Sequence, residues 1–150
     1  MGASGWDYVI DYDGDVEAAV TALQARVFQE EYGDHATYRS MDDLYADHEF
    51  MGTEGTHTIL DIDRLVVTDA PAVSSDDYGT LRPLALDRVL HHFGTRSPSV
   101  EQFEKVVEAA SEAYENSLLD ECRIQWAACY VLLHTGGTPT HLGIFGSSGD

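Results

Sequence analysis

The stretch Ile124-Gln-Trp-Ala-Ala-Cys-Tyr-Val-Leu-Leu-His134 is the most apolar run of the chain, and Thr135-Gly-Gly-Thr-Pro-Thr140 and His141-Leu-Gly-Ile-Phe-Gly146 follow it. Apolar side chains occupy both alternating positions of the run, which is typical of a strand buried on both faces or of a buried helix. The two glycines can adopt positive φ and the proline cannot donate to a sheet, so the next segment favours a chain reversal. The β-branched and aromatic residues favour a strand, although Gly136-Gly137 could instead end a helix. We predict a central strand within residues 124–134, paired with a strand at 141–145.

The remaining chain shows the periodicities of both strands and helices. Strands are predicted where apolar residues alternate, and helices where they recur at intervals of three and four. We predict an α+β fold whose small, mainly antiparallel sheet, including the C-terminal β-hairpin, is covered by about four helices. The first strand is expected to be the other neighbour of the central strand. The predicted segments are strands at Trp6–Tyr12 and within His57–Val67, and helices at Val16–Tyr32, Met41–Phe50, Leu84–Phe93 and Val100–Leu118.

The length of 150 residues, with 43% hydrophobic and 10% aromatic residues, is typical of one folded domain. We expect a single α+β domain over residues 1–150, with loose ends at about 1–5 and 147–150. Cys122 and Cys129 are expected to be buried free thiols of a reducing compartment, too far apart to bridge if they lie on one strand. The chain shows no basic and apolar leader and no apolar run near the roughly 20 residues of a membrane span. A cytoplasmic location is therefore expected.

The net charge of −19 is the most unusual feature of the composition. Residues 1–77 carry 18 acidic and 3 basic side chains, whereas residues 78–150 carry 9 and 5. Such a field disfavours direct contact with nucleic acid or anionic membranes and favours a basic protein surface. Adaptation to high salt, or a genome that prefers arginine codons, would also explain an acidic chain whose only lysine is Lys105. Salt adaptation would spread the charge over the whole surface, whereas here it is concentrated in the first half.

One acidic segment has the spacing of the start of a calcium-binding loop. Asp11, Asp13 and Asp15 alternate along it, but the positions that need Gly and a bidentate Glu hold Val16 and Ala22. Capping of the helix that follows explains these acids without a metal.

Two groups of histidines and acids could form a metal or catalytic site. His57, Asp61 and Asp63 would share one strand face, where an imidazole and two carboxylates suit zinc or manganese. His134 and His141 would be directly opposed across a four-residue hairpin loop. Ion pairing and the polar ends of buried strands explain the presence of these residues without a metal or catalytic role. We therefore expect no metal, cofactor or catalytic residue. A small metal- or nucleotide-dependent enzyme or ligand-binding domain built on these five residues stays open as the alternative.

The charge therefore favours a non-enzymatic acidic binding protein. Such a protein would sequester or inhibit a basic protein partner, as an immunity protein or a nucleic-acid mimic does, and its oligomeric state stays open. Carboxylates of the predicted helix 41–50 and of a mobile acidic loop at 70–79 would steer the encounter, and tyrosines would anchor it. The residues expected to bind the partner are Asp42, Asp43, Asp47, Glu49, Asp76, Asp77, Tyr38 and Tyr45.

Overall fold

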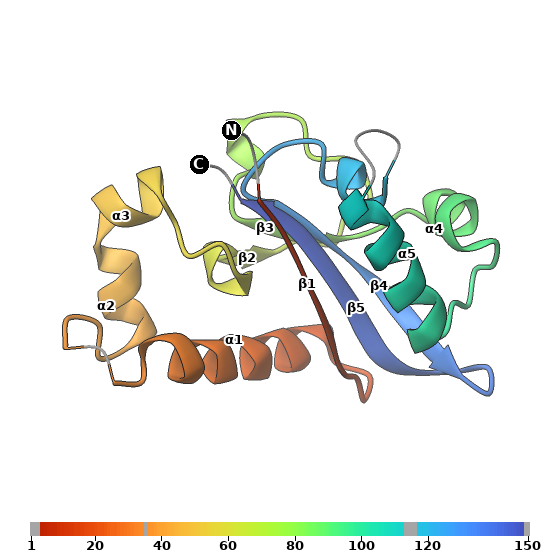
Figure 1. Ribbon diagram of the computed structural model, residues 1–150, viewed down its shortest axis with the longest axis horizontal. Helices are drawn as coiled ribbons and strands as arrows, with labels where there is room; N and C mark the ends of the chain where they lie inside the picture. The colour runs from red at the N-terminus through yellow and green to blue at the C-terminus, as the bar shows by residue number, and fades with distance from the viewer. Residues whose placement is uncertain (1–3, 35, 113–116, 149–150) are drawn as a thin grey trace.

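The computed structural model describes residues 4–34, 36–112 and 117–148, which form a five-stranded sheet with helices on both faces (Figure 1). Along the sheet the strands follow the order β1-β5-β4-β3-β2. The strands are β1 Ser4–Asp11, β2 Arg64–Leu65, β3 Thr80–Pro83, β4 Ala127–Thr135 and β5 Thr138–Ser148. The fold is thus mixed α and β, and β4 is the middle strand, as the apolar run at 124–134 predicted.

The sheet is mixed, and the prediction of a mainly antiparallel sheet was wrong in this respect. β1 pairs with β5 and β5 with β4 in antiparallel fashion, but β3 runs parallel to both β4 and β2. The pairing of β3 with β4 is parallel, and the chain between these two strands crosses over through helices, as parallel neighbours require. The other neighbour of β4 is therefore β3 rather than the segment at Trp6–Tyr12, which pairs with β5 instead.

Five α-helices lie in the described part of the chain: α1 Val16–Tyr32, α2 Met41–Ala46, α3 His48–Thr53, α4 Leu86–Phe93 and α5 Val100–Glu112. α1 has the predicted bounds, whereas the predicted helix 41–50 is two short helices separated by Asp47, whose φ of −82° and ψ of 78° are not helical. α4 begins two residues later than predicted because the Leu84 amide still donates to the Tyr130 carbonyl of β4. Part of the predicted extension of α5 to Leu118, including Tyr114, lies outside the described residues.

The two faces of β4 contribute to two separate hydrophobic cores, one on each side of the sheet. α1 and the 3₁₀ helix Ile59–Asp61 pack on one face of the sheet, against Ala128 and the partly buried Tyr130. α4, α5 and the 3₁₀ helix Leu118–Cys122 pack on the other face, against Cys129 and Val131. Figure 1 shows α1 on one side of the strands and α4 and α5 on the other. The two-sided apolar pattern of β4 therefore reflects helices on both faces.

The hairpin turn is shorter than the sequence suggested, and β1 and β5 extend further towards the two ends of the chain. Gly136 and Gly137, with φ of 59° and 82°, form a two-residue turn, which needs positive φ at both positions. Ser4 and Gly5 belong to β1, and β5 continues to the fully buried Ser148. Residues 4–5 and 147–148 are thus not loose, because each pairs across the β1–β5 ladder. Within the described ranges, every helix is too short or too polar to cross a membrane.

Candidate functional site

The predicted cluster of His57, Asp61 and Asp63 does not share a strand face. β2 covers only Arg64–Leu65, and Asp61 ends a 3₁₀ helix instead. Asp61 is buried and accepts four hydrogen bonds, from the Thr56 amide and hydroxyl at 2.6 and 2.9 Å, the His57 amide at 2.8 Å and the Ser148 hydroxyl at 2.7 Å. Asp63 is exposed and lies 3.5 Å from Arg64. Asp61 thus has a structural role, since its oxygens are occupied by donors of the protein.

The two hairpin histidines are not opposed to each other either. Leu133 is opposite His141 and Pro139 is opposite His134, because the register shifts between Leu133 and His134. The two side chains consequently belong to opposite faces of the sheet. His141 Nε2 lies 3.4 Å from Asp11 Oδ1, and the His134 amide donates to the Pro98 carbonyl at 2.8 Å. No group of three or more His, Cys, Asp or Glu suited to a metal ion occurs among the described residues.

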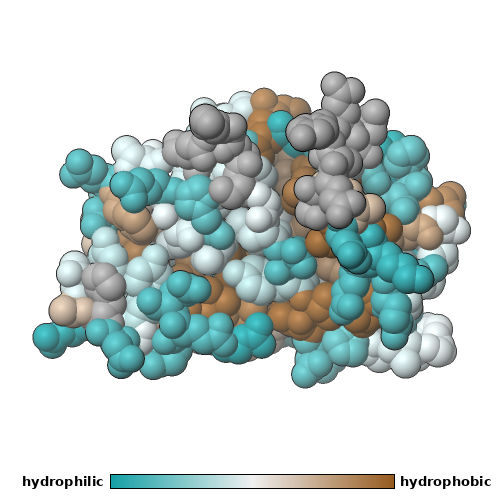
Figure 2. All heavy atoms as spheres, viewed as in Figure 1, coloured by the Kyte–Doolittle hydropathy of each residue, from teal (hydrophilic) through white to brown (hydrophobic). Residues whose placement is uncertain are grey.

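The acids predicted to bind a partner fall into two groups. Asp42, Asp43 and Glu49 are exposed on α2 and α3. Asp47 lies between these helices, accepts from the Phe50 amide at 3.1 Å and caps α3. Figure 2 shows hydrophilic residues along the lower edge of the molecule, over α1. The second group, Asp76 and Asp77, lies in the 3₁₀ helix Ser75–Asp77, just before β3. Figure 1 shows the segment that precedes β3 apart from α2 and α3.

Several of the predicted contact residues make internal interactions. The Tyr38 hydroxyl donates to Asp47 at 2.6 Å; this bond raises the pKa of Tyr38 to about 12 and lowers that of Asp47. Asp77 accepts from the Val73 amide at 2.8 Å and from Arg82 at 3.0 Å, and these bonds lower its pKa. Tyr45 is half-buried, and its burial raises its pKa to about 12. The predicted mobile loop at 70–79 is thus anchored through Asp77.

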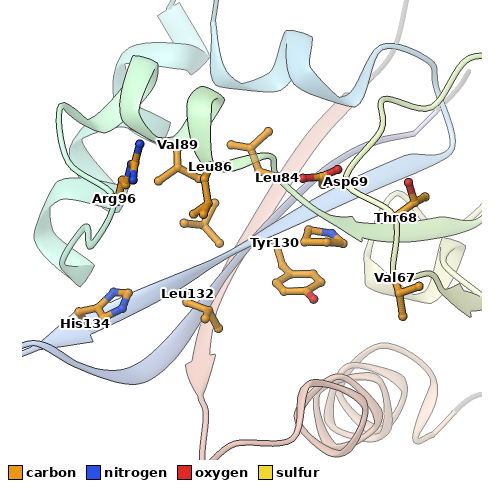
Figure 3. A pocket seen from close by; sticks show the side chains of 12 residues that line it. Val67, Thr68, Asp69, Leu84, Leu86, Val89, Arg96, Tyr130, Leu132 and His134 are labelled. Carbon is orange, nitrogen blue, oxygen red and sulfur yellow. The ribbon is translucent and has the colours of Figure 1, made fainter.

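A groove of about 540 Å³ opens beside β4, and sequence reasoning did not find it (Figure 3). Its volume is in the range of pockets that bind small ligands. It lies where the parallel strands β2, β3 and β4 reach their carboxyl ends, which is where open α/β sheets bind ligands. We call it the β4 groove. Its walls are Val67–Asp69 after β2, Pro83 at the end of β3, Leu84 and Leu86 after β3, Tyr130–Leu132 and His134 on β4, with Val89 and Arg96.

A buried ion-pair cluster adjoins the β4 groove. Glu121 accepts from Arg88 Nε at 2.6 Å, and His92 Nε2 lies 3.1 Å from the same carboxylate oxygen. Burial acts to raise the pKa of Glu121, but the hydrogen bonds from His92 and Arg88 outweigh it and the pKa is lowered. The cluster lines two smaller hollows, of about 250 and 140 Å³, that continue the groove along α4. A satisfied carboxylate of this kind stabilises the contact between α4 and the 3₁₀ helix Leu118–Cys122.

One signal in the sequence could have located this region. The chain has only eight basic residues, and the second half holds five of them. Four of the eight line the β4 groove and its two neighbouring hollows. Sequence periodicity alone does not predict that these four arginines lie near one another. These residues are Arg82, Arg88, Arg96 and Arg123.

Comparison with known proteins does not assign the chain to a family. No family model matches it, and searches of curated proteins and of solved structures give no significant match.

Proposed function

We propose that this chain is a non-enzymatic acidic binding protein that sequesters or inhibits a basic protein partner, in the cytoplasm. The observation that carries the proposal is the set of exposed carboxylates on α2 and α3. Asp42, Asp43 and Glu49 form no ion pair with a described residue, and neither helix contains Lys or Arg. Within the described residues the Asp43 carboxylate accepts only from the Arg39 amide, at 3.0 Å, so no cation compensates its charge there. Unpaired charges of one sign steer a partner of the other sign during encounter.

The internal hydrogen bonds divide the proposed contact residues by role. Four carboxylates remain available to a partner: Asp42, Asp43 and Glu49 of the first group, and Asp76 of the second. Asp47 would act indirectly, by holding Tyr38 and the start of α3 in place. An enzyme is the less favoured alternative, because the five residues proposed for it do not converge. Within this alternative, the β4 groove favours a domain that binds a small ligand over an enzyme.

The test is a pull-down from the native host with three baits. The first is the wild-type chain, and the second carries Asp42→Asn, Asp43→Asn and Glu49→Gln. The third is a matched control that removes three exposed charges elsewhere, through Asp13→Asn, Glu101→Gln and Glu104→Gln. We expect the wild type and the control to retain one basic protein that the α2–α3 variant loses. At about 0.5 M salt, where charges are screened beyond a few ångströms, all three baits should bind weakly and alike.

Salt-dependent melting separates this proposal from salt adaptation. A partner-binding acidic surface predicts that the chain stays folded at 0.1 M salt. A chain adapted to high salt would unfold on transfer from molar salt to about 0.1 M, with or without the substitutions. That result, together with recovery of no basic partner, would contradict the proposed function.

A further inference from the structure

The edge of β4 is open along part of the β4 groove. The Leu84 amide donates to the Tyr130 carbonyl at 3.0 Å, and the His134 amide donates to the Pro98 carbonyl at 2.8 Å. Leu132 lies midway between these residues, and backbone groups two residues apart on a strand point to the same edge. Its N–H and C=O therefore face the groove, and neither has a backbone partner there in the described residues. β3 ends at Pro83 and the chain turns into α4, which leaves this position without a neighbouring strand.

One end of the groove carries positive charge and a buried nitrogen without a hydrogen-bond partner in the described residues. Arg96 is exposed and forms no ion pair with the described acids, in a chain of net charge −19. His134 Nδ1 is buried and has no hydrogen-bond partner among the described residues. The segment that carries Arg96 is held beside His134 through the Pro98 carbonyl, and Figure 3 shows both side chains at the same end of the groove. A buried nitrogen without a partner is uncommon, so a ligand group that binds there would remove an existing cost.

The wall between this end and the opposite end is apolar and exposed. Leu86 is 60% exposed and lies beside Val89, whereas Val67, which is 96% exposed, lies towards the opposite end in Figure 3. Apolar side chains left open around a groove with a few convergent polar groups are typical of a ligand site. The middle of the groove thus suits an apolar side chain, next to the free backbone groups of Leu132.

From these three features we infer that the β4 groove binds the carboxyl-terminal residues of a peptide whose last side chain is apolar. The terminal segment would lie parallel to β4, in line with the end of β3. Its backbone N–H and C=O would pair with Leu132, as in strand addition to a sheet edge. Its carboxylate would lie between Arg96 and His134, and its last side chain against Leu86 and Val89. A fatty acid would satisfy the charge and the apolar wall but not Leu132, so the open backbone favours a peptide.

The probe is the hexapeptide Lys-Gly-Ser-Gly-Val-Leu with a free carboxylate, titrated by isothermal calorimetry against the full chain. We expect saturable binding at one site. The same peptide with a terminal amide should bind about tenfold more weakly, because a hydrogen bond to a charged group is lost. An ester in place of the last amide should weaken binding severalfold, because it removes the donor to the Leu132 carbonyl. Decanoate, which lacks the backbone groups, should bind more weakly than the peptide.

Protein variants locate the site. Arg96→Gln should weaken the free acid about tenfold and abolish its advantage over the amide, whereas Arg39→Gln, an exposed arginine near α2, should change neither. Leu86→Asp, at an exposed rim position, should weaken both peptides without unfolding the chain. Equal binding of acid and amide, decanoate binding as tight as the peptide, or no binding at about 1 mM peptide would overturn the inference. Loss of the basic partner in the pull-down would leave it intact, because none of the groove residues is changed there.

Discussion

Ser148 donates a hydrogen bond of 2.7 Å to Asp61, and so connects the last described residue of β5 to the 3₁₀ helix Ile59–Asp61. The Ser148 hydroxyl in turn accepts from Trp6 Nε1 at 2.9 Å. The three buried side chains thus join β1, β5 and the segment before β2 through one continuous set of bonds. Because the ends of this network come from distant parts of the chain, its polar groups find partners only in the complete fold.

Replacing Asp61 should destabilise the fold by about 2–4 kcal/mol. In Asp61→Asn the amide NH₂ would face donors that now bind a carboxylate oxygen, so at least one buried donor would lose its partner. The matched control is Asp63→Asn, since Asp63 is exposed and should change the free energy of unfolding by only a few tenths of a kcal/mol. Urea denaturation of the two variants measures the difference. Equal stability of both variants would show that Asp61 is not required for folding.

Glu121 should make stability depend on pH in the acidic range. Its pKa is lowered in the folded protein, so its ionised form stabilises the fold above the usual value of 4.5. This contribution should decline as pH falls below 4.5 and through the lowered pKa of the folded state. Glu121→Gln should cost about 2 kcal/mol near pH 7, because it leaves Arg88 and the buried His92 without their anionic partner. Thermal melts from pH 7 to 3 should show the difference from wild type shrinking with acidification; a constant difference would contradict this role.

The sequence predicted those elements whose pattern is local. Val16–Tyr32 was predicted with its observed bounds because an apolar stripe, the capping Asp15 and a terminal glycine all agree. The run at 124–134 was correctly predicted to hold a central strand, observed at Ala127–Thr135, because its β-branched and aromatic residues favoured a strand over a buried helix. β3 was missed because four residues ending in Pro83 carry no periodicity. Its absence from the prediction explains both the wrong neighbour for β4 and the expectation of a mainly antiparallel sheet.

The candidate sites were less predictable because they depend on contacts between distant residues. Asp61 resembles a surface or metal-binding carboxylate in the sequence, and its burial and its contact with the distant Ser148 become visible only in the folded chain. His134 and His141 are separated by a register shift that no local pattern indicates. The β4 groove exists because β3 ends before β4 does. This can be recognised only when the order of the strands in the sheet is known. Charge composition indicated an acidic surface but not where its few arginines gather.

Substitution within β4 should separate core from surface clearly. Val131→Asp would place a carboxylate among the apolar side chains of α4 and α5, at a cost of several kcal/mol that should unfold the chain. Asp42→Asn, on the exposed side of α2, should shift stability by a few tenths of a kcal/mol. Circular dichroism melts compare the two. Similar melting temperatures for both variants would contradict the central position of β4.

Tyr38 should titrate unusually late, with a pKa of about 12. Its hydroxyl donates to Asp47, and ionisation would place two negative charges at the two ends of that 2.6 Å contact. Asp47→Asn should return the pKa towards 10, and the neutral Asn should still cap α3. Ultraviolet titration of Tyr38→Phe, wild type and Asp47→Asn separates this group from the other tyrosines. An unchanged titration in Asp47→Asn would show that the hydrogen bond does not control Tyr38.

Cys122 and Cys129 should react with thiol reagents only when the fold opens. Both thiols are buried and free, but they do not share a strand: Cys122 lies in the 3₁₀ helix Leu118–Cys122 and Cys129 in β4. A hydrogen bond with Cys129 and burial raise the pKa of Cys122 well above its usual value, so its reactive thiolate is scarce near pH 8. Labelling with a disulfide reagent in native buffer should therefore be slow, and its rate should rise with urea in proportion to the unfolded fraction. Rapid labelling of one cysteine without denaturant, at the rate of a free thiol, would show that the core around β4 is open to solvent.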